Sequence, residues 1–175
     1  TEGFPLLTTK AISFENVARE LLFFLRGQTN VWHLLKNDVH IWTSNAYERY
    51  KRTTEFWNEV NEADHEVLTQ DEFEKAIKEC DHPSSLADHY ENFAGLWGDL
   101  GEIYGARWRD AGGFDQIENL VEQLQDSPDS RRLRVDAWKP SVHMKGAPDA
   151  DKAALPPCHC SFQVFTRERL DGNRG

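Results

Sequence analysis

Apolar residues recur at intervals of three and four positions in several stretches of the chain, a spacing that places them on one face of an α-helix. The first stretch predicts a helix from Phe14 to about Arg26, with Ser13 as its N-cap and Gly27 as its stop. Its apolar stripe at helical spacing consists of Phe14, Val17, Ala18, Leu21, Leu22 and Leu25.

Further helices are predicted by the same spacing together with capping signals. A short helix starts at about Thr29, another carries a capping box formed by Thr69 and Glu72, and a third starts at Asp115 and ends before Pro128. The first of these carries Val31, Trp32, Leu34 and Leu35. The second has Phe73, Ala76, Ile77 and Cys80 on one face, and the third is expected to point Ile117, Leu120, Val121 and Leu124 inward.

Alternation of apolar and polar residues predicts strands. One covers residues 132–138, with Leu133, Val135 and Ala137 on one face, and another covers residues 159–166. We also predict a strand over residues 1–9, a polar loop over 142–153 and a hairpin turn at 171–173. Helices and strands mix without a regular βαβ repeat, which favours an α+β fold, a mixed β-sheet packed with helices.

The composition fits one compact domain. The chain has 175 residues, 39% of them hydrophobic, and no apolar run approaches the roughly 20 residues that cross a bilayer. We therefore expect neither a secretion leader nor a membrane partner. Three cysteines are too few, and odd in number, for a disulfide framework, which favours a cytoplasmic location.

The negative charge is concentrated in one segment. Residues 43–95 carry 13 acidic and 5 basic residues, whereas the rest of the chain carries 17 acidic and 15 basic ones. Phosphates would be repelled there, which argues against a nucleic-acid substrate. Because the segment has few aliphatic residues, we interpret it as a peripheral, partly helical insertion in a single domain spanning residues 1–175.

Cys158 follows two prolines that fix the backbone just before a predicted strand. A stiff approach holds a thiol in one place, as a nucleophile requires, although a structural cysteine is the plainer alternative. Zinc is another alternative, because Cys158, His159 and Cys160 are all ligand types. Structural zinc sites use ligand pairs separated by two to four residues, which the sequence lacks, so we expect no metal.

Two weaker patterns concern charged residues. Arg131 and Arg132 follow a turn and can donate several hydrogen bonds to a phosphate, although such a pair is also typical of solvated surface. Glu20 lies at the border of the first apolar stripe, an environment used for proton transfer, although a boundary glutamate commonly points to water. Neither pattern identifies a function by itself.

A set of motifs occurs in the order and spacing of one enzyme family and covers nearly the whole chain outside the acidic segment. The motifs are Gly3-Phe4-Pro5 with Thr8-Thr9-Lys10, Glu20 to Leu25, Gly27 with Thr29-Asn30, Ile41-Trp42, Gly98-Asp99-Leu100-Gly101 with Tyr104-Gly105, Trp108-Arg109, Asp115-Gln116-Ile117, Pro128 to Arg132, Ala137-Trp138 and Leu155 to His159. With these motifs the chain resembles thymidylate synthase.

The resemblance implies a methyltransferase that makes dTMP from dUMP, with 5,10-methylenetetrahydrofolate as the one-carbon and hydride donor. Cys158 matches the nucleophile, which adds to C6 of the pyrimidine so that C5 can attack the one-carbon unit. Glu20 matches a glutamate that organises waters and moves protons. Tyr104 matches a tyrosine near the thiol and the departing C5 proton.

The resemblance also implies a homodimer formed through the sheet, with shared active sites. Arg131 and Arg132 match a pair that reaches the dUMP phosphate of the other subunit, and His159 is expected to support dUMP binding. Ile41 and Trp42 match folate-binding positions. The sequence lacks the family's N-terminal arginine loop and the part that follows the cysteine strand, so we expect an internal fragment that is inactive alone.

Two alternatives stay open. A pyrimidine deoxynucleotide hydroxymethylase of the same fold uses the same cysteine, but Trp42 and the Pro157-Cys158-His159 context favour the synthase. A non-catalytic family member that serves as a binding or dimerisation module is disfavoured by the intact catalytic and arginine residues. One departure concerns folate, because Thr43-Ser44-Asn45-Ala46 follows Trp42 where many members have Asp-Glu-Trp-Ala.

Overall fold

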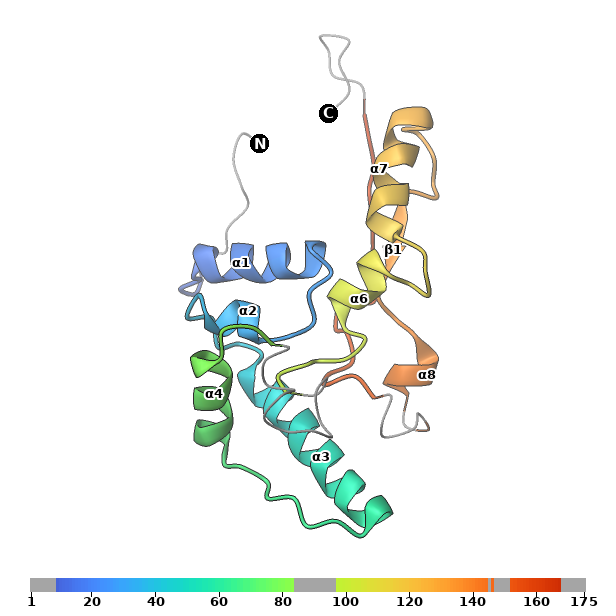
Figure 1. Cartoon of the computed structure of the whole chain (residues 1–175). Coiled ribbons are helices and arrows are strands. Elements are labelled where there is room, and N and C mark those ends of the chain that lie inside the picture. Colours follow the sequence, from blue (N-terminus) through green and yellow to red (C-terminus); the bar gives the residue numbers. More distant parts are fainter. Residues whose placement is uncertain (1–8, 84–96, 145, 147–151, 168–175) are drawn as a thin grey trace.

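The computed structural model describes residues 9–83, 97–144, 146 and 152–167, shown in colour in Figure 1. Its elements are α1 (Phe14–Leu25), α2 (Trp32–Leu35), α3 (Thr43–Asn61), α4 (Gln70–Glu79), α6 (Tyr104–Arg109), α7 (Gln116–Asp126), β1 (Arg134–Asp136), α8 (Pro140–His143) and β2 (Ser161–Gln163). Helices with a small sheet agree with the predicted α+β class. The predicted hairpin turn and nearly all of the predicted first strand lie outside the described residues. Among those residues, no helix has both the length and the apolar character needed to span a membrane.

Helix α1 begins and ends where the sequence predicts. The Ser13 side chain accepts a hydrogen bond from the Asn16 N–H at 3.4 Å. Gly27 follows the helix with φ at +70°, and a Cβ on it would approach the Cβ of Arg109 to 3.0 Å, so the turn requires glycine.

The apolar stripe of α1 is largely exposed, although Leu25 at its end packs against the core. Phe14, Val17, Leu21 and Leu22 are 46–50% exposed, whereas Phe23 and Phe24 are buried. Helix α1 is apolar on more than one face, and its aromatic pair packs into the core with α2 and α6. Helical spacing alone therefore could not select the buried face.

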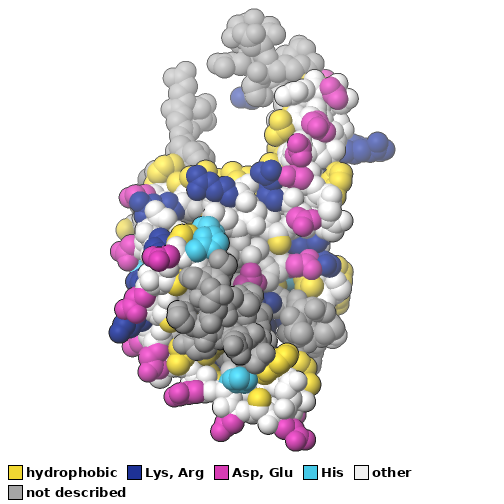
Figure 2. Space-filling view, in the orientation of Figure 1, with side chains coloured by type: hydrophobic (Ala, Val, Ile, Leu, Met, Phe, Trp, Pro, Cys, Tyr) yellow, Lys and Arg dark blue, Asp and Glu magenta, His cyan; other side chains and the backbone are white. Residues whose placement is uncertain are grey.

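Helices α3 and α4 come from the acidic segment, yet their inner faces belong to the core. Ala46, Tyr50, Phe73 and Ile77 are at most 3% exposed and pack in the same cluster as Trp97. The prediction that this segment is peripheral rather than core is wrong for both helices. Few apolar residues suffice because they share one face of each helix, while acidic side chains cover α4 and the far end of α3 (Figure 2).

Capping signals located the starts of α4 and α7. Thr69 and Glu72 form the predicted capping box of α4, and Asp115 accepts from the Glu118 N–H at 2.9 Å at the start of α7. The short helix α2 begins at Trp32, later than the predicted start at about Thr29. Val31 is its N-cap, and the side chain of Asn30 before it accepts a hydrogen bond from the Trp32 N–H at 2.9 Å.

The small sheet packs against α6 and α7. Strands β1 and β2 are antiparallel, with Val135 opposite Phe162. Leu133, Val135 and Ala137 are at most 1% exposed, which confirms the predicted alternation. Both strands are shorter than predicted. Helix α8 begins at Pro140, before the predicted loop, and its last two residues, Val142 and His143, fall within the first part of that loop.

Candidate active site

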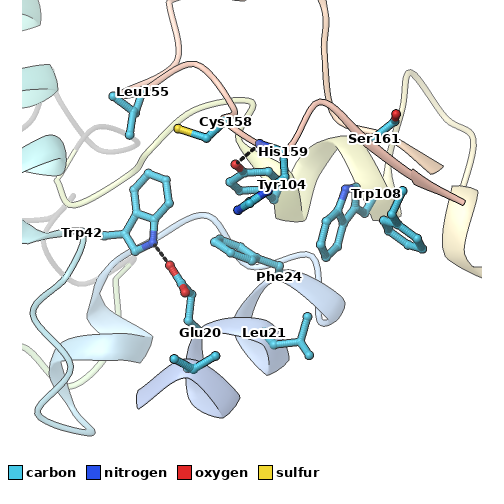
Figure 3. Close-up of a pocket in the computed structure, with 12 residues that line it drawn as sticks. Glu20, Leu21, Phe24, Trp42, Tyr104, Trp108, Leu155, Cys158, His159 and Ser161 are labelled. Carbon is cyan, nitrogen blue, oxygen red and sulfur yellow. Dashed lines mark hydrogen bonds between the residues drawn. The ribbon is translucent and has the colours of Figure 1, made fainter. Parts of the chain in front are cut away.

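The predicted nucleophile lines a cavity of about 500 Å³ between α1, α6 and the loop that precedes β2 (Figure 3). A volume of this order is typical of small-molecule sites. Most of the wall is apolar or aromatic. The lining residues are Val17, Glu20, Leu21, Phe24, Trp42, Tyr104, Trp108, Leu155, Cys158, His159, Ser161 and Phe162.

Glu20 and Trp42 are joined by a hydrogen bond on the cavity wall. The indole Nε1–H of Trp42 donates to Glu20 Oε1 at 2.6 Å (Figure 3). Trp42 occupies the N-cap position of α3 and is 7% exposed, so packing fixes its ring. A bond of this length to a carboxylate orients the acceptor, and it keeps one Glu20 oxygen at the edge of the cavity.

Four buried aromatic rings build the floor of the cavity. Phe24 is central, with its ring centroid 4.8 Å from Tyr104 and 5.9 Å from both Trp42 and Trp108. The tilted and edge-on arrangements are those that aromatic quadrupoles favour. Trp108 also packs edge-on against Phe162 of β2 at 5.4 Å, so the floor is continuous with the sheet.

The segment that carries Cys158 is held on both sides of the thiol. Pro157 before it is buried, and the His159 N–H after it donates to the Tyr104 hydroxyl at 3.1 Å (Figure 3). Cys158 itself is exposed and lines the cavity. Cys160 folds back on the same segment, with its thiol donating to the Pro157 carbonyl at 3.6 Å. The predicted stiff approach to the thiol is therefore present.

The structure brings together five of the predicted site residues. Cys158, Glu20, Tyr104, His159 and Trp42 all line the cavity, although they come from distant parts of the chain. Glu20 from α1 and Cys158 from the opposite wall approach the same space (Figure 3). A polarised carboxylate, a phenol and an accessible thiol at one apolar cavity can support nucleophilic addition coupled to proton transfer.

Three predicted residues lie outside the cavity. Ile41 is 50% exposed and does not line it, although it precedes Trp42. Arg131 and Arg132 are exposed in the turn before β1, where the Arg131 carbonyl accepts from the Gln163 side chain at 2.7 Å. The resemblance assigns both arginines to the site of another subunit, so their position outside their own cavity is compatible with that role, which stays a prediction.

Sequence reasoning missed part of the lining. Val17, Leu21 and Phe24 lie on the same side of α1 as Glu20, and Trp108 lies one helical turn after Tyr104. Helical spacing around Glu20 and Tyr104 could have found these four. Leu155, Ser161 and Phe162 carry no such signal, because their place in the lining depends on contacts between segments that are distant in the sequence.

The zinc alternative rested on Cys158, His159 and Cys160. Within the part of the chain that the structure describes, no three His, Cys, Asp or Glu side chains come together as metal ligands. Cys80 lies at the end of α4, where its thiol donates to the Ile77 carbonyl at 3.1 Å. The absence of a metal stays a prediction.

Comparison with known proteins shows which family the sequence matches. The sequence matches the thymidylate synthase family over residues 1–173. It is 41% identical over 169 residues to a protein of Malacoplasma penetrans and 40% identical over 175 residues to one of Staphylococcus haemolyticus, both named thymidylate synthase. The alignments cover 97% and 96% of this chain but 50% and 53% of those proteins. The chain thus spans about half the length of the curated relatives it matches.

Proposed function

Because the chain belongs to the thymidylate synthase family, we propose that the protein containing it makes dTMP from dUMP, with 5,10-methylenetetrahydrofolate as the one-carbon and hydride donor. One observation carries the proposal: Cys158, Glu20, Tyr104 and Trp42 come from separate segments and line one cavity. A nucleophile, a proton-transfer carboxylate, a phenol and an aromatic platform are the groups that this chemistry needs.

The thiol of Cys158 acts as the nucleophile in this proposal. C5 of uracil is a weak nucleophile until the thiolate adds to C6, which converts the ring into an enolate. The enolate carbon C5 then bonds to the methylene carbon of the folate. Loss of the C5 proton, loss of the folate amine, hydride transfer to the methylene and expulsion of Cys158 give dTMP and dihydrofolate.

Glu20 and Tyr104 serve the proton transfers. The Trp42 indole holds one Glu20 oxygen, which leaves the carboxylate oriented toward a ring bound beside Cys158. The Tyr104 oxygen accepts from the His159 N–H, so its own proton is free to point into the cavity near the thiol. Trp42 presents its ring to the folate, and His159 supports the nucleotide.

We further propose that the protein is a homodimer with shared sites. Phe165, just after β2, is 78% exposed, and a large exposed apolar side chain beside the sheet supports association of two copies there. Arg131 and Arg132 of one subunit would then contact the dUMP phosphate of the other. Three free cysteines support a location in the reducing cytoplasm.

The test uses the full-length gene product with dUMP and labelled methylenetetrahydrofolate. Formation of dTMP and dihydrofolate is expected, whereas a hydroxymethylated nucleotide with tetrahydrofolate would identify the alternative enzyme. Absence of any turnover would favour the non-catalytic module. Cys158→Ser should lower the rate by roughly a thousandfold or more, while Cys80→Ser, which lies outside the cavity, should retain it.

A further inference from the structure

Arg49 of α3 has a buried guanidinium in the acidic segment. Its side chain is 8% exposed. Its Nε donates to the Lys152 carbonyl at 3.1 Å, and its Nη1 donates to the Asp99 carbonyl at 3.4 Å and lies 3.5 Å from the Asp99 carboxylate. Burial lowers the pKa of Arg49, and the Asp99 charge offsets this only in part. A charged group is buried only where acceptors surround it, so this contact network is specific.

The two acceptors of Arg49 belong to segments that lead directly into the cavity. Lys152 begins the stretch that reaches Cys158, and this stretch is anchored next by the Ala154 N–H, which donates to the Leu100 carbonyl at 2.8 Å. Asp99 begins the stretch that reaches Tyr104. Arg49 therefore joins the approaches to two cavity residues.

Gly101 shows how tightly these segments pack. Its φ is +73°, and a Cβ added there would lie 3.1 Å from Arg49 Nε and 3.3 Å from the Ala153 Cα. No side chain fits between the guanidinium and the two backbone segments. The position of Arg49 and the path of the stretch from Lys152 are consequently linked by direct contact.

The far end of the same stretch is held by Tyr104, whose hydroxyl accepts from the His159 N–H at 3.1 Å. Residues 152–159 are thus tied at one end through Arg49 and Leu100 and at the other through Tyr104, with Cys158 next to the second tie. We propose that Arg49 is a positioning residue for the Cys158 nucleophile, through which α3 of the acidic segment sets the geometry of the cavity. The catalytic part of this inference rests on the function proposed above.

Two other basic residues of α3 can be compared with Arg49. Arg52 donates through Nη2 to the Lys152 carbonyl at 3.4 Å and so contacts the segment that leads to Cys158. Lys51 lies on the outer face, with its side chain 45% exposed and paired with Glu55 at 4.0 Å. Lys51→Gln removes a charge from the same helix without touching the loop, which makes it the matched control.

The experiment compares the full-length wild-type protein with Arg49→Gln, Arg49→Lys and Lys51→Gln. Backbone hydrogen exchange is followed in peptides covering residues 152–159 and, as an internal reference, residues 132–138 of β1. In Arg49→Gln we expect about tenfold faster exchange in 152–159 and an unchanged rate in 132–138. For dTMP formation we expect kcat to fall about tenfold with KM for dUMP within about threefold, because a displaced nucleophile affects the chemical step. Arg49→Lys should lie between Arg49→Gln and the wild type.

Several results would overturn the proposal. These are unchanged exchange in 152–159, faster exchange spread equally over both peptides, a Lys51→Gln variant that behaves like Arg49→Gln, and faster loop exchange without any fall in kcat. Failure of both Arg49 variants to fold would assign Arg49 to stability instead. A wild-type protein that forms no dTMP would refute the proposed function. Hydrogen exchange requires no substrate, so the exchange data would still decide whether Arg49 holds residues 152–159 in place.

Discussion

Trp42 contributes two separable properties to the cavity, a ring that packs edge-on against Phe24 and an N–H that holds Glu20. Trp42→Phe keeps an aromatic ring and removes the N–H. We expect the kcat/KM of the full-length enzyme for dUMP to fall roughly tenfold to a hundredfold, because the carboxylate loses its orienting donor. Steady-state kinetics of dTMP formation measure this.

Trp32→Phe is the matched control for that change. The Trp32 indole N–H donates to the Cys80 carbonyl at 3.1 Å, outside the cavity. This variant loses a comparable hydrogen bond and should keep kcat/KM within about twofold. Equal losses in the two variants would show that the Trp42–Glu20 bond has no particular role in the reaction.

Single residues of the cavity could be predicted where a motif of neighbouring residues in the sequence identifies them. Cys158, Glu20 and Tyr104 were named from motifs, and all three line the cavity. Ser161 and Phe162 were missed, since a strand shows which residues alternate but not which surface they will face. The alternation in β1 correctly predicted that Val135 is buried. It gives no information about Phe162, which pairs with Val135 on β2 and lines the cavity because of the tertiary fold.

At the scale of elements, Gln116 joins α6, α7 and β1. Its side-chain amide donates to the Arg107 carbonyl at 2.6 Å and the Asp136 carbonyl at 2.7 Å, and accepts from the Asp136 N–H at 2.9 Å. Gln116→Ala leaves these backbone groups without their partner, and we expect a destabilisation of about 2–4 kcal/mol. Urea unfolding of the full-length protein measures it.

The control for Gln116 is another glutamine of the same helix. Gln125 is exposed on α7, and Gln125→Ala should change the free energy of unfolding by less than about 0.5 kcal/mol. If the two variants lose similar stability, the effect comes from the helix as a whole. A Gln116→Ala protein with wild-type stability would show that the three bonds are replaced by water without cost.

The boundaries of helices were predicted best where capping residues mark them. Which helices contribute to the core was predicted worst. The Thr69–Glu72 box located α4 because a cap is read from neighbouring residues. The role of α3 and α4 in the core was missed because the acidic residues dominate the composition of residues 43–95. Phe73 and Ile77 are fully buried. A continuous apolar stripe on one face therefore places a helix in the core even when its other faces carry many charged residues.

At the scale of the whole molecule, the 175-residue chain by itself should form no dTMP. Arg131 and Arg132 lie outside the cavity of their own chain, and Val17 and Leu21 beside Glu20 are 47% and 46% exposed, so the described site is open and lacks its phosphate contacts. The assay compares the purified 175-mer with the full-length gene product at equal concentration. Measurable dTMP formation by the 175-mer would contradict the prediction.

The stability of the folded protein should also depend on pH through His143, which is 8% exposed on α8. Its Nδ1 accepts from the Lys139 N–H at 2.9 Å, and its Nε2 lies 3.2 Å from the Glu102 carbonyl. Neutral imidazole satisfies both groups, whereas protonation places a second donor against the Lys139 N–H. Burial lowers the pKa of His143, and the nearby Arg107 and Lys139 charges lower it further against the opposing effect of Glu102.

Because the native state disfavours the charged ring, the unfolded chain binds the proton at higher pH. The stabilisation is fully present above the unfolded pKa of about 6.5 and is lost as pH falls below it. Urea unfolding of the full-length protein between about pH 7.5 and 5.5 should show this loss, and His143→Gln should make the profile flatter. Some slope should persist, since burial also lowers the pKa of His33. Exposed His65 supplies the control, and a His65→Gln variant that flattens the profile as much as His143→Gln would contradict the assignment.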